Sequence, residues 1–188
     1  FYEPTVADAG AATAEECDLN ISLAGVQSIA GSTANWSIIA GNPADITFSS
    51  TTIFNPTVTS TAYSTYTFRL TETNGNCSST DDITVTFTEQ PVADAGTGGN
   101  VCGKDGGNPF TFTGVASAGT GTWTQQSGPG TSNIATPGSA TSTVTVDTYG
   151  TYVFRWTEVN GGCSDFDEVT VTFYEPTVAD AGAATAEE

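Results

Sequence analysis

The sequence ITVTF at Ile83–Phe87 returns as VTVTF at Val169–Phe173, and in both stretches every second residue is apolar. Because the side chains of a β-strand point alternately to the two faces of its sheet, this alternation predicts strands with one buried and one solvated face. The same alternation continues through a chain rich in Thr and Gly, with hardly any helical periodicity. The sequence therefore predicts an all-β protein.

Short alternating stretches are separated throughout by Gly, Pro and Asn residues, which favour turns. The expected strands of the first half are Leu19 to Ala24, Asn35 to Ala40, Asp45 to Ser49, Thr57 to Thr61, Thr65 to Thr73 and Asp82 to Thr88. Those of the second half are Phe110 to Thr113, Thr122 to Gln126, Ser142 to Val146, Thr151 to Glu158 and Glu168 to Phe173. Many short strands joined by tight turns predict antiparallel β-sandwiches rather than a barrel or a solenoid.

Turn and core residues refine this prediction. Asn74-Gly75 and Asn160-Gly161 lie between the last two expected strands of each half, where a hairpin needs residues that tolerate positive φ. Trp36 and Trp123 lie on matching strands, so we expect them to fill the two cores. A solvent-exposed Trp that stacks on a sugar is the alternative.

The chain is internally repeated. Residues 1–16, FYEPTVADAGAATAEE, recur unchanged as residues 173–188, and the pentapeptide VADAG occurs at 6–10, 92–96 and 178–182, at steps of 86 residues. This pattern predicts two sister modules, joined by short Pro-containing connections, within a longer tandem array. The expected boundaries are 1–3 for the end of a preceding module, 4–89 for module A, 90–175 for module B and 176–188 for the start of another module A.

Charge and residue inventory exclude several classes of function. The chain has 21 acidic residues, 3 basic residues and no His, for a net charge of -18. Such a surface would repel nucleic acid and anionic membranes, and no apolar run is long enough to insert in a membrane. Without His, no Ser–His–Asp triad or Cys–His pair can form. We therefore expect no nucleic-acid partner, no membrane insertion in this segment, no enzyme activity and no catalytic cofactor.

Matched charged residues are expected to serve the fold. Arg69 and Arg155 occupy equivalent places, and Glu72 and Glu158 follow three residues later, an odd spacing that puts each pair on opposite strand faces. Each Arg is therefore expected to meet an acid on a neighbouring strand.

Calcium is the one candidate metal ion. Hard cations need several oxygen ligands, and acidic side chains gather near the expected module boundaries. The weak candidates are Glu3, Asp8, Asp81, Glu89, Asp94 and Asp165. No stretch matches an EF-hand loop or a nonapeptide calcium repeat, and solvated surface acids are the alternative.

Four cysteines fall two per half, without a CxxC motif, which is typical of disulfides in an exported protein. Pairing within a module would join Cys17 to Cys77 and Cys102 to Cys163, whereas pairing across the boundary would join Cys17 to Cys163. Each arrangement closes a loop worth about 4 kcal/mol in chain entropy, so energy does not decide between them. Both pairings stay open at this point.

A series of short motifs runs in the same order through both halves. In the second half these are VADAG, Cys102, Trp123, SGP at 127–129, YVFRWTE at 152–158, NGGCS at 160–164 and VTVTF at 169–173. The first half repeats most of them. This order resembles the PKD/REJ-type immunoglobulin-like repeats that are abundant in giant surface proteins of Bacteroidota, including gliding-motility adhesins exported by type IX secretion. The resemblance implies an extracellular, cell-surface array of immunoglobulin-like modules and no catalytic residue.

Two functions follow as hypotheses. The first is a structural repeat of a surface adhesin, stalk or filament, with neighbouring modules, lateral copies in a fibre or a surface polysaccharide as candidate partners. The alternative is a carbohydrate- or ligand-binding immunoglobulin-like module, which should expose clustered aromatic residues. The residues that would form such a cluster are Tyr2, Phe54, Tyr63, Phe166 and Tyr174.

Overall fold

The computed structural model describes residues 2–180, which divide into two compact units. Unit 1 takes in residues 2–91 together with 160–164, and unit 2 takes in 92–159 together with 165–180. Almost all regular structure is β-strand, so the all-β prediction is confirmed. The expected module boundaries at 1–3 and 176–188 rest partly on Phe1 and on residues 181–188, which lie outside the described residues.

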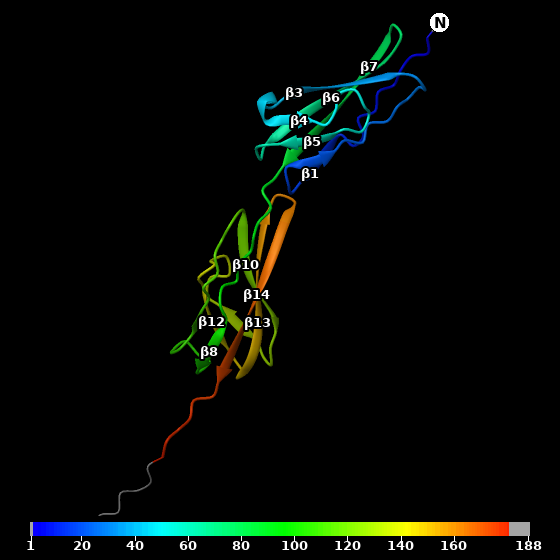
Figure 1. Ribbon diagram of the computed structural model, residues 1–188. Coiled ribbons are helices and arrows are strands. Elements are labelled where there is room, and N and C mark those ends of the chain that lie inside the picture. Colours follow the sequence, from blue (N-terminus) through cyan, green and yellow to red (C-terminus); the bar gives the residue numbers. More distant parts are fainter. Residues whose placement is uncertain (1, 181–188) are drawn as a thin grey trace, which may run out of the picture. The chain divides into compact units, whose positions relative to one another are not determined.

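Unit 1 is built from two sheets (Figure 1). Its elements are β1 (Thr13–Glu16), β2 (Asn20–Ser22), β3 (Thr33–Ala40), the 3₁₀ turn η1 (Pro43–Asp45), β4 (Ile46–Phe48), β5 (Thr57–Ser60), β6 (Thr65–Asn74) and β7 (Cys77–Phe87). One sheet has the order β1-β7-β6-β3 and the other the order β2-β5-β4. Neighbouring strands are antiparallel except that β1 runs parallel to β7.

The core of unit 1 lies between these sheets. Ile21 and Val58 come from the three-stranded sheet, and Trp36, Phe68 and Val85 come from the four-stranded sheet. All five side chains are at least nine-tenths buried, and the indole of Trp36 is 2% exposed. The alternation read from the sequence therefore marks the inner face, and the core-filling role predicted for Trp36 is confirmed.

Unit 2 repeats this plan. Apart from the hairpin tip at 160–164, which belongs to unit 1, its strands are β8 (Gly99–Cys102), β9 (Phe110–Thr111), β10 (Thr120–Ser127), β11 (Ser132–Ile134), β12 (Thr143–Val146), β13 (Gly150–Asn160) and β14 (Cys163–Tyr174), in sheets of order β10-β13-β14-β8 and β11-β12-β9. Trp123 is also 2% exposed. Its ring stacks on Phe112 at a centroid distance of 3.9 Å and lies 5.3 Å from Trp156, so it too fills a core.

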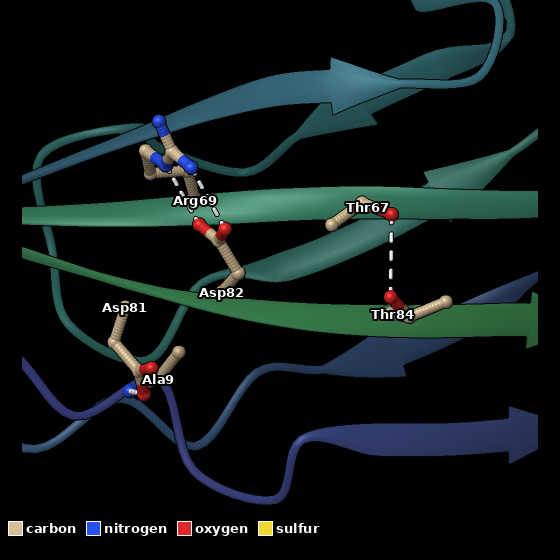
Figure 2. A network of polar contacts seen from close by, with 6 residues as sticks. All are labelled: Ala9, Thr67, Arg69, Asp81, Asp82 and Thr84. Carbon is tan, nitrogen blue, oxygen red and sulfur yellow. Dashed lines mark hydrogen bonds and ion pairs between the residues drawn. The ribbon is translucent and has the colours of Figure 1, made fainter.

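The outer face of the four-stranded sheet in unit 1 is polar. Arg69 on β6 donates from Nε and Nη2 to the two carboxylate oxygens of Asp82 on β7, at 2.7 and 2.8 Å (Figure 2). In unit 2, Arg155 donates to one oxygen of Glu168 on the next strand at 2.7 Å. The prediction that each Arg meets an acid on a neighbouring strand is confirmed.

Sequence reasoning missed the short strands β1, β8 and β11. Their sequences, TAEE, GNVC and SNI, lack the alternation of the longer strands, because each pairs with one neighbour at a sheet edge. The strands on both sides of each hairpin turn are also longer than expected. Asn74 and Asn160 are the last residues of β6 and β13. Of the Asn-Gly pair in each turn, only the glycine adopts positive φ, at 60° for Gly75 and 57° for Gly161.

Candidate functional site

The turn at 160–164 is held in unit 1 by a disulfide and several hydrogen bonds. Cys163 is bonded to Cys17, with their Cα atoms 5.5 Å apart, and is 1% exposed. Beside it, the N–H of Gly162 donates to the carboxylate of Glu15 at 2.9 Å. The turn is thus held by a covalent bond and a charge-assisted hydrogen bond, both to residues at the end of β1.

Two side-chain amides hold the flanks of this turn. Asn160 donates from Nδ2 to the carbonyl of Glu89 at 2.9 Å, and Gln90 donates from Nε2 to the carbonyl of Ser164 at 2.9 Å. Gly161 has a φ of 57°, and an added Cβ there would collide with the Glu15 carboxylate. The positive φ therefore favours glycine at this position, whereas the Glu15 carboxylate, at the end of a flexible side chain, could move aside.

The carboxylate of Glu15 accepts two hydrogen bonds in this contact. The hydrogen bond from the Gly162 N–H, followed by one from the Thr88 hydroxyl at 2.8 Å, lowers the pKa of Glu15 below its ordinary value. The carboxylate is therefore ionised at neutral pH. The sequence contained no motif that singled out Glu15, because its partner lies 147 residues away along the chain.

Unit 1 contains a second turn of the same construction between β6 and β7. Asn74 donates from Nδ2 to the carbonyl of Glu3 at 3.2 Å, as Asn160 does to that of Glu89. The sulfur of Cys77 lies 3.9 Å from the carbonyl oxygen of Tyr2, and Cys77 is a free thiol. This turn has the same anchoring amide as the turn at 160–164 but no disulfide.

The strand registers rule out pairing of cysteines within a module. β1 runs parallel to β7 with Glu16 opposite Phe87, whereas Cys77 is the first residue of β7, ten residues earlier. At about 3.3 Å per residue, Cys17 and Cys77 therefore lie at opposite ends of a strand about 33 Å long. A disulfide needs Cα atoms within about 7 Å. The pairing of Cys17 with Cys77, one of the two alternatives, does not form for this reason.

The same argument applies along β14. Cys102 is the register partner of Tyr174, the last residue of β14, whereas Cys163 is its first residue. Cys102 therefore has no route to Cys163, and its side chain is an exposed free thiol. The alternative that joins Cys17 to Cys163 is the one that the structure contains.

The acidic residues considered for calcium are mostly engaged with the backbone. Asp81 accepts the N–H of Ala9 at 2.8 Å (Figure 2), and Asp165 accepts that of Ala93 at 3.0 Å. These bonds tie the start of each repeat to its last strand.

The other calcium candidates are spread along the same segments. Asp8 and Asp94 each accept the N–H two residues ahead, from Gly10 at 2.8 Å and Gly96 at 2.7 Å. The contacts of Glu3 and Glu89 described above use their main-chain carbonyls. Across residues 2–180, no three Asp, Glu, Cys or His side chains come together as metal ligands. Calcium binding at these six residues stays a prediction.

Two buried carboxylates were not anticipated as sites. Glu72 is 0% exposed and accepts hydrogen bonds from Ser28 N–H at 2.9 Å, from the Ser28 hydroxyl at 2.7 Å, from Ile29 N–H and from the Ser32 hydroxyl. Burial raises the pKa of Glu72, but the hydrogen bonds from Ser32, Ser28 and Ile29 together outweigh it and leave the pKa below its ordinary value. Glu158 accepts equivalent bonds from Ser117. Each of these two carboxylates therefore anchors a loop to a strand of its own unit.

The aromatic residues do not gather into a binding platform. Phe54 packs against the core of unit 1, so it is not an exposed loop residue. Tyr63 precedes β6, whereas Tyr2 lies against Gly75 in the turn after β6, so the two lie at opposite ends of that strand. In unit 2, the guanidinium of Arg155 lies 3.9 Å from the ring of Phe166, which is 54% exposed. Tyr174, 55% exposed, is eight residues farther along β14, about 26 Å away at 3.3 Å per residue.

A shallow hollow of about 220 Å³ lies on β11 and β12 in unit 2, lined by Thr131, Ser132, Asn133, Thr145, Val146 and Asp147. No aromatic ring lines it, and Asp147 is occupied by the N–H and hydroxyl of Thr131 at 2.8 and 2.7 Å. The hollow therefore lacks the stacking surface that sugar-binding sites use.

Comparison with known proteins identifies the fold class. The chain resembles extracellular domains 3–5 of Drosophila OTK, with a TM-score of 0.55, 9% identity, and coverage of 86% of this chain and 58% of that one. Sidekick-1 immunoglobulin domains 1–4 match with a TM-score of 0.47 and 9% identity over 87% of this chain and 46% of that one. Hemolin, an insect immune protein, matches with a TM-score of 0.45 and 11% identity over 92% of this chain and 47% of that one. The two sheets of each unit, together with the likeness to OTK, identify an immunoglobulin-like β-sandwich, as expected.

No protein-family model matches the sequence, and no curated protein is similar to it. The chain spans about half the length of the first two solved structures that it resembles. At such low identities the likeness identifies the fold and not the activity. Over the residues that the structure describes, no helix has the length and apolar character needed to cross a membrane.

Proposed function

We propose that this chain is a structural repeat pair of an extracellular bacterial surface adhesin, in which such pairs follow one another as a stalk or filament without catalytic activity. The observation that carries the proposal is the Cys17–Cys163 disulfide. It joins the end of the first strand of one repeat to the hairpin turn of the next, and the equivalent positions of the two repeats hold Cys102 and Cys77. A bond of this kind can be continued along an array.

The chemistry of the chain supports an extracellular, cell-surface location. Structural disulfides persist in oxidising compartments and are rare in the cytosol. A net charge of -18 keeps a long polymer soluble and opposes collapse of one part on another. The order of motifs that resembles PKD/REJ-type repeats supports the narrower proposal that the chain comes from a giant Bacteroidota surface protein of the gliding-motility adhesin type.

The polar residues of both units support a structural role. Asp81, Asp165, Glu72 and Glu158 all accept hydrogen bonds from their own unit. The exposed aromatic residues lie apart, which disfavours a sugar-binding module. The proposed partners are the neighbouring modules of the same chain, with lateral copies in a fibre and surface polysaccharide as further candidates.

Small-angle X-ray scattering on oxidised fusions of one, two and three copies tests this proposal. A stalk predicts a maximum dimension that increases by a constant increment with each copy. Compact growth, in which the radius of gyration follows about the 0.38 power of chain length, would contradict it. Binding of the single chain to a glycan array tests the alternative, a ligand-binding module. Saturable binding that is lost on alanine substitution of exposed Tyr63 or Tyr2 would favour that alternative.

A further inference from the structure

Two cysteines, Cys77 and Cys102, carry free thiols, and each occupies the place of a cysteine that is bonded in the other repeat. Cys77 starts β7 after the Asn74-Gly75 turn, as Cys163 starts β14 after the Asn160-Gly161 turn. The two turns also share the glycine conformation, with φ of 60° and 57°.

Cys102 corresponds to Cys17 by strand register. In unit 1, Glu16 lies opposite Phe87, the residue equivalent to Phe173, and Cys17 follows it. In unit 2, Val101 lies opposite Phe173 and Cys102 lies opposite Tyr174. The two free thiols therefore correspond to the two halves of the Cys17–Cys163 bond, with Cys102 in the place of Cys17 and Cys77 in the place of Cys163.

We infer that Cys102 forms a disulfide with Cys77 of a second copy of this chain that follows it in tandem. The inference rests on the proposed tandem array and names the contact between successive copies. Its geometric basis is a shared tyrosine, because residues 173–188 have the same sequence as residues 1–16 and Tyr174 of one copy would be Tyr2 of the next.

Both thiols lie next to this tyrosine. Cys102 is the register partner of Tyr174, and neighbouring strands lie about 4.8 Å apart. Cys77 has its sulfur 3.9 Å from the carbonyl oxygen of Tyr2. When Tyr174 and Tyr2 are the same residue, the two cysteines meet at it. The Asn74 amide already donates to Glu3, the residue that matches Glu175.

The hydrogen bond that accompanies the known disulfide also has a counterpart. Glu15, which accepts the N–H of Gly162, lies opposite Thr86 on β7. Asn100 lies opposite Thr172, the equivalent residue of β14, and is exposed. Its amide oxygen is placed to accept the N–H of Asn76 in the following copy, as a neutral substitute for the carboxylate.

Formation of the bond requires a disulfide oxidant, such as oxidised glutathione or an exported thiol oxidase. The Cys102 thiolate attacks the disulfide of the oxidant, forms a mixed disulfide and releases one thiol. The Cys77 thiolate of the following copy then attacks the sulfur of Cys102 and releases the second thiol of the oxidant. Two protein thiols lose two protons and two electrons, and the disulfide of the oxidant becomes two thiols.

The test uses a fusion of two copies that overlap through their shared sixteen residues, oxidised with glutathione and mapped by mass spectrometry without reduction. We expect a peptide pair that joins Cys102 of the first copy to Cys77 of the second, and two free thiols per fusion instead of four. Cys102→Ser in the first copy should abolish the pair, whereas Cys102→Ser in the second copy should leave it intact. The Cys17–Cys163 peptide in each copy verifies folding.

Four free thiols in a folded, oxidised fusion would overturn the inference, as would Cys102 linked to any cysteine other than Cys77 of the following copy. Scattering from the same fusion separates this outcome from failure of the proposed function. An extended fusion with four free thiols contradicts the disulfide alone, whereas a linked but compact fusion contradicts the stalk.

Discussion

The hairpin turns at 74–77 and 160–163 have nearly the same local structure but opposite chemical states. Each has an Asn that donates to a main-chain carbonyl 71 residues earlier, and each has a glycine at positive φ. Cys163 is buried and bonded, whereas Cys77 is partly buried and free. Although the turns themselves match, Cys163 meets Cys17, which follows β1, whereas Cys77 has no cysteine partner among the described residues.

The largest effect should come from the two cores, which ought to respond alike. Trp36→Ala and Trp123→Ala should each lower the free energy of unfolding of their own unit by about 3–5 kcal/mol, because each removes a fully buried ring and leaves a cavity. Urea denaturation followed by circular dichroism measures this. Tyr63→Ala, at a side chain 47% exposed, is the control and should change stability by less than about 0.5 kcal/mol. A cost below about 1 kcal/mol for either Trp would contradict the core assignment.

The next effect should separate the two turns. Replacing Cys17 and Cys163 together with Ala should destabilise unit 1 by about 2–4 kcal/mol, because the disulfide restricts the unfolded chain. The matched control, Cys77→Ala with Cys102→Ala, removes two free thiols and should cost less than about 0.5 kcal/mol. Chemical denaturation of oxidised proteins gives both values. Equal costs for the two double variants would abolish the distinction between the turns.

The buried carboxylates test a feature that the repeats share. Glu72→Gln should cost about 1–3 kcal/mol at pH 7, because an amide nitrogen replaces an oxygen that accepts hydrogen bonds from Ser28 and Ser32. The lowered pKa of Glu72 means that its stabilisation is complete above the ordinary value of 4.5 and is lost as pH falls through the folded pKa.

Stability measured against pH should therefore show the difference between wild type and Glu72→Gln shrinking below about pH 4.5. A difference that stays constant down to pH 2.5 would show that the charge of Glu72 contributes nothing.

The smallest effect should distinguish the two surface ion pairs. Arg69 binds both oxygens of Asp82, whereas Arg155 binds one oxygen of Glu168. The hydrogen bond from Arg69 lowers the pKa of Asp82, but the side chains are 41% and 38% exposed and so are screened by solvent. Double-mutant cycles with Ala should give a coupling of about 0.2–1 kcal/mol for Arg69–Asp82, weaker in high salt, and less for Arg155–Glu168. A stronger coupling in unit 2 would contradict this reading.

The sequence was sufficient for the long strands and the cores. Alternation along β6, β7, β13 and β14 identifies the inner faces, since each of these strands has one face buried. It was insufficient for β1 and β8, which are short edge strands held by pairing with one neighbour rather than by burial. Those missing strands were the ones needed to place Cys17 and Cys102, so the disulfide alternatives stayed open.

The contact of the turn at 160–164 could not be read from sequence for a related reason. Glu15 and Gly162 are ordinary surface residues in their own segments, and no local pattern relates two residues 147 positions apart. The odd spacing placed Glu72 on the strand face opposite Arg69, but its role could not be predicted because its hydrogen-bond donors Ser28 and Ser32 lie in an irregular loop.

Peptide mapping of the single oxidised chain without reduction tests the central claim most directly. The account predicts one linked peptide pair, Cys17 with Cys163, together with free thiols at Cys77 and Cys102. Linked peptides that join Cys17 to Cys77, or Cys102 to Cys163, would contradict the strand registers on which both the proposed array and its continuation depend.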